Sequence, residues 1–223
     1  MEPIAHIRSP FVEKFGVPRQ SGLAPHVSAR VDFTPAYRHE DYVRGLSAFS
    51  HIWLIWGFHC HSSAEVHATV RPPRLGGNTR LGVFATRSPF RPNGLGLSAV
   101  RLLAVEPGPA LLIAGADMVD GTPVYDIKPY IPYADSIPEA DGAFAATAPC
   151  SGLLSVELPQ KLPHGLSQEW LAALREILLQ DPRPAYQNDP TRTYHLIFHP
   201  CEVDFCVEPG GTLRVLTLRR LSS

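Results

Sequence analysis

The chain has 223 residues, 44% of them apolar, and a formal net charge of −1 at pH 7, which suits one large domain or a domain with a small appendage. No run of about 18 apolar residues occurs, so the sequence excludes a membrane-spanning helix. The 23 prolines argue against a helix-dominated fold. Because the N-terminus lacks the basic-then-apolar pattern of a signal peptide, we expect a cytoplasmic protein.

Short apolar runs predict a first part rich in β-strands. A short helix is expected over residues 41–49, where Tyr42, Leu46 and Phe49 have helical spacing. Residues 106–109, Glu-Pro-Gly-Pro, predict a hairpin turn. The expected strands of this part cover residues 51–58, 98–105, 110–114 and 123–128.

The second part begins after a segment rich in Ala, Pro and Gly, residues 136–152, which is typical of a linker. A helix is expected over residues 167–180, with Ser167 as its N-cap and Pro182 beyond its end. Strands are expected over 194–198, 201–207 and 213–218. The prediction is therefore a mainly β protein, with a β-rich domain over 1–150 and a small α+β domain over 151–223.

Charge is unevenly distributed along the chain. Residues 66–105 contain six arginines and neither Asp nor Glu, so the remainder is net negative. A positive surface attracts anions, and nucleic acid is the large anion that arginine binds by displacing counterions. The alternative is an ordinary solvated basic loop.

Several common catalytic motifs are absent. The segment Asn93-Gly-Leu-Gly96 lacks the third glycine of a dinucleotide-binding turn, and no phosphate-binding P-loop or Gly-x-Ser-x-Gly elbow occurs. Four histidines cluster, and two of them would share one side of a strand, which either forms part of a metal site or marks a polar strand end. No third and fourth ligand has convincing spacing, so no metal is predicted. These histidines are His51, His59, His61 and His67.

The four cysteines, Cys60, Cys150, Cys201 and Cys206, are scattered and are expected to be free thiols.

Two further segments suggest binding. Asp120-Gly-Thr-Pro123 is a turn before an expected strand, where it either contacts a ligand or has Asp120 bonding its own backbone. Asp181-Pro-Arg-Pro-Ala-Tyr186 is rigid, and it either presents Arg183 and Tyr186 to RNA or only stops the preceding helix.

Many ordered motifs together resemble one family across nearly the whole chain. They include Ile7-Arg-Ser-Pro-Phe11, Glu13-Lys-Phe-Gly-Val-Pro-Arg-Gln20, Thr69-Val-Arg-Pro-Pro-Arg-Leu-Gly-Gly-Asn78, Gly82-Val-Phe-Ala-Thr-Arg-Ser88 and Asp120-Gly-Thr-Pro-Val124. The family is the TsaA-like, or TrmO-type, tRNA methyltransferase. The resemblance implies a small β-barrel that uses S-adenosylmethionine, forms homodimers with the cofactor near the subunit contact, and methylates N6 of threonylcarbamoyladenosine at tRNA position 37.

The resemblance also implies site residues. Cys60 and Ser21 depart from the family pattern, which is harmless if they act through backbone atoms. The implied cofactor contacts are Arg19, Gln20, Ser21, His59, Cys60, Arg87, Leu97, Asp120, Gly121, Thr122 and Pro123.

Chemistry suggests roles for some of these residues. Arg19 or Arg87 can bind the cofactor carboxylate through the guanidinium fork. The N6 proton has three candidate acceptors, namely His59, Asp120 and Asp126. The expected tRNA contacts are Arg71, Arg74, Arg80, Arg91, Arg183 and Tyr186, of which the first four would hold the anticodon-loop backbone or the threonine carboxylate. Two alternatives stay open: a tRNA-binding protein without catalysis, and a metal-dependent hydrolase that uses the histidine cluster.

Overall fold

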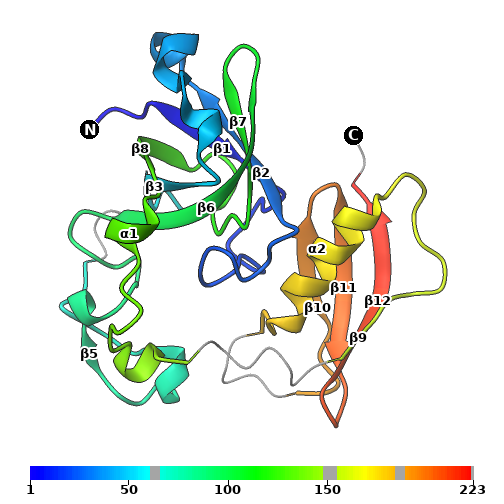
Figure 1. Ribbon diagram of the computed structural model, residues 1–223. Coiled ribbons are helices and arrows are strands. Elements are labelled where there is room, and N and C mark those ends of the chain that lie inside the picture. Colours follow the sequence, from blue (N-terminus) through cyan, green and yellow to red (C-terminus); the bar gives the residue numbers. More distant parts are fainter. Residues whose placement is uncertain (61–65, 148–154, 184–188, 222–223) are drawn as a thin grey trace.

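The computed structural model describes residues 1–60, 66–147, 155–183 and 189–221, except for the side chain of Arg74. Figure 1 shows a closed β-barrel beside a second sheet that is covered by one long helix. The barrel strands pair in the order β1-β2-β7-β6-β3-β8, and β8 closes on β1. Their bounds are β1 (Ala5–Arg8), β2 (Ser28–Phe33), β3 (His51–Gly57), β6 (Leu95–Glu106), β7 (Ala110–Ala114) and β8 (Pro123–Pro129).

Alternation of apolar and polar side chains builds this barrel, because successive side chains of a strand point to opposite faces. In β3, Ile52, Leu54 and Trp56 are buried while His51 is exposed. The same alternation in the other strands fills the interior with Ile7, Val31, Val100, Leu111, Ile113 and Val124. The predicted barrel and the strands expected over 51–58, 98–105, 110–114 and 123–128 are confirmed, as is the turn at 106–109.

The predicted helix over 41–49 is wrong. Two short 3₁₀ turns, η2 (Glu40–Val43) and η3 (Leu46–Ala48), occupy this segment. Gly45 separates them with φ of 83°, a left-handed conformation that interrupts a helix. A third 3₁₀ turn, η1 (Pro35–Tyr37), precedes them.

Between β3 and β6 the chain leaves the barrel. It forms the small pair β4 (Thr69–Val70) and β5 (Leu81–Gly82), with 3₁₀ turns η4 (Pro73–Leu75) and η5 (Val83–Ala85). After β8 come the short helix α1 (Pro132–Asp135) and the turn η6 (Ala143–Ala145). Residues 136–147 are exposed throughout, as a linker would be.

The second sheet has the strand order β10-β11-β12-β9. Its strands are β10 (Tyr194–Phe198), β11 (Cys201–Val207), β12 (Thr212–Arg220) and β9 (Ser155–Glu157). The predicted strands are confirmed, whereas β9 was not foreseen. It is only three residues long and pairs in parallel with β12.

The long helix is α2 (Gln168–Leu179), as predicted. The Ser167 hydroxyl accepts the backbone N–H of Trp170 at 3.1 Å, satisfying one of the free amides at the helix start. Leu174, Ile177 and Leu178 are buried in the core shared with the sheet. None of the helices in the described ranges is long and apolar enough to cross a membrane.

The segment between β1 and β2 packs into this second core rather than into the barrel. The Phe11 ring lies 5.6 Å from the Phe198 ring, and the Phe15 ring lies 6.3 Å from the Phe205 ring. Ala24 and Val27 of the same segment are also buried there. The division at residue 150 therefore stays a prediction, because early residues complete the later core.

Candidate functional site

One end of the barrel gathers the loops that carry the predicted cofactor contacts. The register places the end of β3 beside the starts of β6 and β8, since Gly57 pairs with Leu95 and Trp56 with Val124. The start of β2 lies beside the end of β7, where Ser28 pairs with Ala114. The predicted residues at this end are Arg19, Gln20 and Ser21 before β2, His59 and Cys60 after β3, Arg87 and Leu97 before and within β6, and Asp120 to Pro123 at β8.

The β7–β8 loop is fastened to the end of β1 by Asp120. Its backbone N–H donates to the Phe11 carbonyl at 2.7 Å, and its carboxylate accepts the Ser9 N–H at 3.0 Å. The same carboxylate lies 3.5 Å from the Arg8 guanidinium. Gly121 follows with φ of 77°, which glycine adopts without strain. Asp120 therefore bonds neighbouring backbone rather than its own, and this holds the turn in place.

His59 lies against this turn. Because β3 ends at Gly57, His59 is not within a strand, and His61, predicted to share one side of a strand with it, lies outside the described residues. The Thr122 hydroxyl donates to the Val119 carbonyl at 2.7 Å and lies 3.3 Å from His59 Nδ1. A hydroxyl that already donates can only accept from His59, so Nδ1 carries the ring proton. His59 Nε2, 3.2 Å from the Cys60 thiol, is then the basic nitrogen of the ring.

Asp117 is the functional candidate that the sequence interpretation missed. Ser98 Oγ donates to its carboxylate at 2.7 Å and accepts the indole N–H of Trp56 at 3.0 Å. The backbone N–H of Ser21 also bonds to Asp117, and the field of Arg87 reaches it. Burial raises the pKa of the Asp117 carboxyl from 3.8 to about 6, against the lowering effect of these partners. No local motif marks Asp117.

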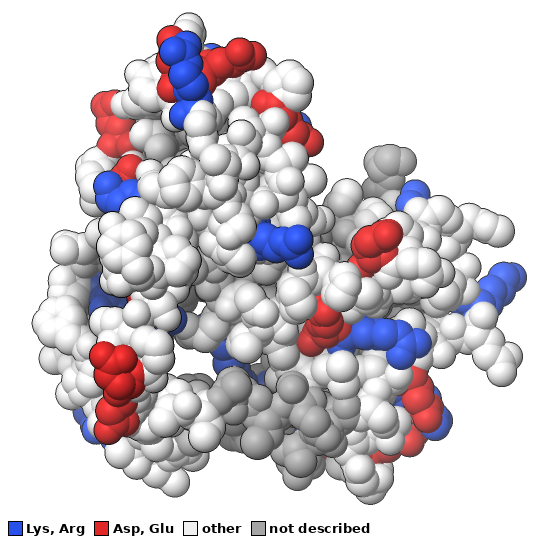
Figure 2. Space-filling view, in the orientation of Figure 1, with Lys and Arg blue, Asp and Glu red and all other residues white. Residues whose placement is uncertain are grey.

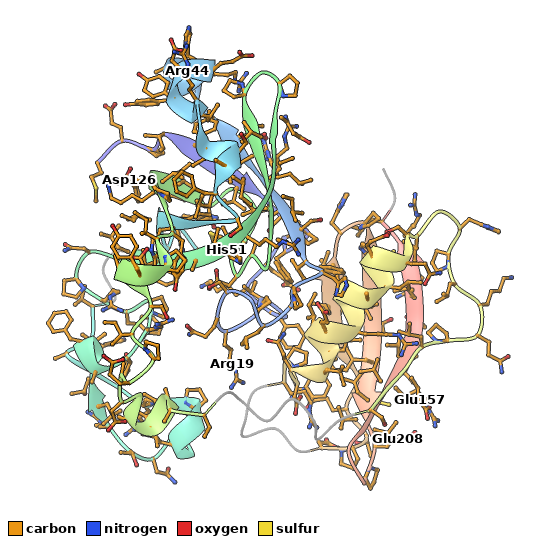
Figure 3. All side chains as sticks on the ribbon, viewed as in Figure 1. Arg19, Arg44, His51, Asp126, Glu157 and Glu208 are labelled. Atoms are coloured by element: carbon orange, nitrogen blue, oxygen red, sulfur yellow. The ribbon has the colours of Figure 1, made fainter. Side chains whose placement is uncertain are left out.

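The Arg87 guanidinium donates to the Gln20 side-chain carbonyl. The structure thus brings Gln20, Ser21 and Arg87 together around Asp117. Arg19 instead lines a hollow of about 450 Å³ between residues 14–19 and the end of α2. Figure 3 shows Arg19 on the loop between the barrel and α2.

Leu97 and Asp126 lie on the outside of the barrel wall. Both are register partners of Ile55, one on each side of β3, so their side chains share the outer face. Leu97 is 56% exposed. The Asp126 carboxylate accepts the Ile127 N–H at 2.9 Å and lies 3.0 Å from Lys128 Nζ. The structure therefore does not place Asp126 in contact with His59 or Thr122.

The arginines predicted to contact tRNA are mostly open. Arg71 and Arg80 are exposed, and Arg91 is half-buried with its guanidinium donating to the Thr86 carbonyl at 3.2 Å. Within the described ranges, none of these three forms an ion pair with an acid. The side chain of Arg74 lies outside the described part. On the face drawn in Figure 2, basic and acidic side chains are interspersed rather than gathered in one patch.

Arg183 is occupied by a neighbour. Its fork donates two hydrogen bonds of 2.8 Å to the Asp181 carboxylate, and its side chain is only 10% exposed. These bonds raise the pKa of the Arg183 guanidinium above its ordinary value. Its predicted RNA contact stays a prediction, and one edge of the guanidinium is already taken by Asp181. Tyr186 lies outside the described residues.

Metal and thiol chemistry find little support in the described ranges. No group of three or more potential ligands lies together there, and His61 is outside them. His51 is the first residue of β3, whereas His59 follows the other end of that strand. Cys60, Cys201 and Cys206 are free thiols, as predicted, and Cys150 is not among the described residues.

The fold and the site define a class. A closed barrel, whose loop end joins a basic imidazole nitrogen, a carboxylate and exposed arginines, is a barrel-based ligand-binding domain. It is not a doubly wound nucleotide-binding sheet.

The chain belongs to the TrmO family. The model of the tRNA-methyltransferase O N-terminal domain matches residues 6–136, and that of the TrmO C-terminal domain matches residues 154–221. The tRNA (adenine(37)-N6)-methyltransferase of Escherichia coli (strain K12) is 43% identical over 94% of both chains. A putative S-adenosylmethionine-dependent methyltransferase of Pseudomonas aeruginosa is 42% identical over 97% of this chain and 96% of its own. The crystal structure of TrmO from Pseudomonas aeruginosa superposes with a TM-score of 0.79, at 36% identity and 97% coverage of both chains.

Proposed function

We propose that the protein is an S-adenosylmethionine-dependent tRNA methyltransferase. It methylates N6 of adenosine 37, next to the anticodon, on tRNA that already carries threonylcarbamoyl there. The observation that carries this proposal is the similarity, over nearly the full length of both chains, to a relative whose name states methylation at N6 of adenine 37.

The residues at the loop end of the barrel fit the cofactor. The described residues include a half-buried aspartate, Asp117, whose carboxylate forms no ion pair, and an exposed arginine, Arg87. S-adenosylmethionine carries the complementary charges, an ammonium group and a carboxylate, on its methionyl part. Its sulfonium supplies an activated methyl group. The residues that would hold it are Arg19, Gln20, Ser21, His59, Cys60, Arg87, Leu97 and Asp120 to Pro123.

A base must accept the N6 proton during transfer. His59 is the best placed of the three candidates, because its Nδ1 lies beside Thr122 and Nε2 is left as the basic nitrogen. Asp120 is engaged by Ser9 and Arg8, and Asp126 by Lys128. A urea-like N–H is more acidic than a plain adenine amine, so a weak base suffices.

Arg71, Arg80 and Arg91 would bind the phosphates of the anticodon loop. We expect the Arg71→Ala and Arg80→Ala variants each to weaken tRNA binding. Each should also reduce the slope of log K against log salt by about one, since each removes one phosphate contact. Binding is measured by filter retention from 50 to 200 mM salt. Arg44→Ala, an exposed arginine paired with Asp41 at the far end of the barrel (Figure 3), is the control. Unchanged slopes in both variants contradict the assignment.

A homodimer is part of this proposal. Leu97 and Ile55 lie on the outer face of the barrel, and α1 covers part of the same wall, because Trp53 Nε1 donates to Asp135 at 3.0 Å. On α1 the Tyr133 side chain is 91% exposed. The exposed apolar side chains of Leu97 and Tyr133 on this face suit a second copy, which places Leu97 near both the site and the contact. We also propose the cytoplasm, where tRNA is modified, as its location.

The test supplies purified protein with labelled S-adenosylmethionine and total tRNA from two kinds of cells, which can and cannot make threonylcarbamoyladenosine. Label in the first tRNA alone is the expected result. Equal label in both tRNAs would remove the requirement for the earlier modification. tRNA binding without label in either would favour a binding protein that has lost catalysis.

A further inference from the structure

Asp117 holds a fixed carboxylate among the proposed cofactor contacts. Ser98 Oγ donates to it at 2.7 Å, and Trp56 donates to Ser98 at 3.0 Å, so its orientation is set from the barrel interior. On the other side it accepts the backbone N–H of Ser21. Part of its surface stays open. The carboxylate is therefore held in place, in a half-buried position at the loop end of the barrel.

The charge of this carboxylate has no direct partner in the described ranges. Burial raises the pKa of Asp117 to about 6, so the group is ionised at neutral pH only at a cost. Arg87 is the basic side chain whose field reaches it, while Ser98 and Ser21 are neutral. The Arg87 guanidinium donates to Gln20 instead of pairing with Asp117. A partly buried charge of this kind favours a ligand that brings a cation.

An acid and a base that lie close together without pairing can bind the two charges of an α-amino acid. Its carboxylate and its ammonium group sit on one carbon atom, so a ligand that reaches Arg87 with the first brings the second near Asp117. Guanidinium groups bind carboxylates through their fork. The ammonium group has three donors and needs an acceptor, which Asp117 supplies.

We propose that Asp117 binds the α-ammonium group of the methionyl part of S-adenosylmethionine, while Arg87 binds its carboxylate. This assignment rests on the proposed function. It makes Asp117 a cofactor-binding residue that selects ligands with a free amino group.

The test is titration calorimetry of the Asp117→Asn variant with three ligands. S-adenosylmethionine carries the ammonium and the sulfonium, S-adenosylhomocysteine carries the ammonium alone, and 5′-methylthioadenosine carries neither. We expect the variant to bind the first two about 10- to 100-fold more weakly, by the same factor, because both lose a charge-assisted hydrogen bond. Binding of 5′-methylthioadenosine should be unchanged. Glu139→Gln, which neutralises an exposed carboxylate outside the site, is the control and should alter none of the three.

The other outcomes overturn the assignment in distinct ways. Weakening of S-adenosylmethionine alone would place the sulfonium at Asp117. Equal weakening of all three ligands would mean that Asp117 only shapes the loop at Ser21. Unchanged binding in the variant removes the assignment and leaves the proposed function standing. A wild-type protein that binds none of the three removes both.

A second measurement uses the wild-type protein and needs no variant. Only the ionised carboxylate holds an ammonium group, so affinity for S-adenosylhomocysteine should fall as the pH drops below about 6 and level off above it. The Asp117→Asn variant should lack this dependence between pH 5 and 7.5. A dependence that persists in the variant would belong to another group and would count against the proposal.

Discussion

Replacing Arg87 with alanine is expected to weaken the binding of S-adenosylmethionine about 10- to 100-fold, because a charge-assisted hydrogen bond to the ligand carboxylate is lost. The exposed Arg87 guanidinium reaches the loop of Gln20 and Ser21, so its loss also frees Gln20. The affinity of Arg87→Lys should lie between those of the wild-type protein and Arg87→Ala, since lysine keeps the positive charge but lacks the guanidinium fork. Dissociation constants from calorimetry and the rate of methyl transfer at limiting cofactor measure both variants.

The matched control is Arg101→Ala. Arg101 is an exposed arginine of the same acid-free window, but it lies six residues beyond Leu95 along β6, about 20 Å from the start of that strand. Its loss should leave cofactor binding unchanged. If Arg87→Ala and Arg101→Ala had equal effects, general charge rather than a specific contact would be the cause.

Truncating Leu174 to alanine is expected to lower the free energy of unfolding by roughly 3 kcal/mol. The Leu174 side chain is fully buried between α2 and the second sheet, so its loss removes apolar contacts and leaves a cavity. For a chain of this size the melting temperature should fall by about 6–12 °C. Alanine keeps the helix propensity of α2, so the effect reports packing.

Leu216→Ala makes the same chemical change on an exposed side of β12, where Leu216 is 44% exposed. It should alter the unfolding free energy by less than about 0.5 kcal/mol. Urea titrations of both variants give the comparison. A small effect at Leu174 would mean that the second core tolerates cavities and is loosely packed.

The strands with strong apolar content could be predicted from the sequence. The run from His51 to Gly57 alternates buried and open side chains, and α2 has both a cap and an apolar face. β1 and β2 were missed, because their outward faces carry His6, Arg8 and Arg30 and their inward faces include small alanines. Apolar and polar residues do alternate in both strands, but over too few residues to be recognised among the charged side chains.

The candidate site residues were taken from the motifs of the family resemblance, and their roles stay a prediction. Asp117 was missed for a physical reason: its partner Ser98 is 19 residues away, and only the pairing of β6 with β7 brings them together. The helix predicted over residues 41–49 was wrong for a local reason. The spacing of Tyr42, Leu46 and Phe49 is helical, but the left-handed conformation of Gly45 interrupts the helix.

Residues 11–27 are synthesised early but pack against elements that are synthesised late. Phe11, Ala24 and Val27 leave the ribosome among the first residues, yet their partners on α2 and β10 leave among the last. Arg19, Gln20 and Ser21 lie between these anchors. The barrel can close earlier, but the binding loop gains its final shape only after the second core has formed. Because Arg19, Gln20 and Ser21 are proposed to bind the cofactor, a nascent chain should bind it fully only after the second sheet has been made.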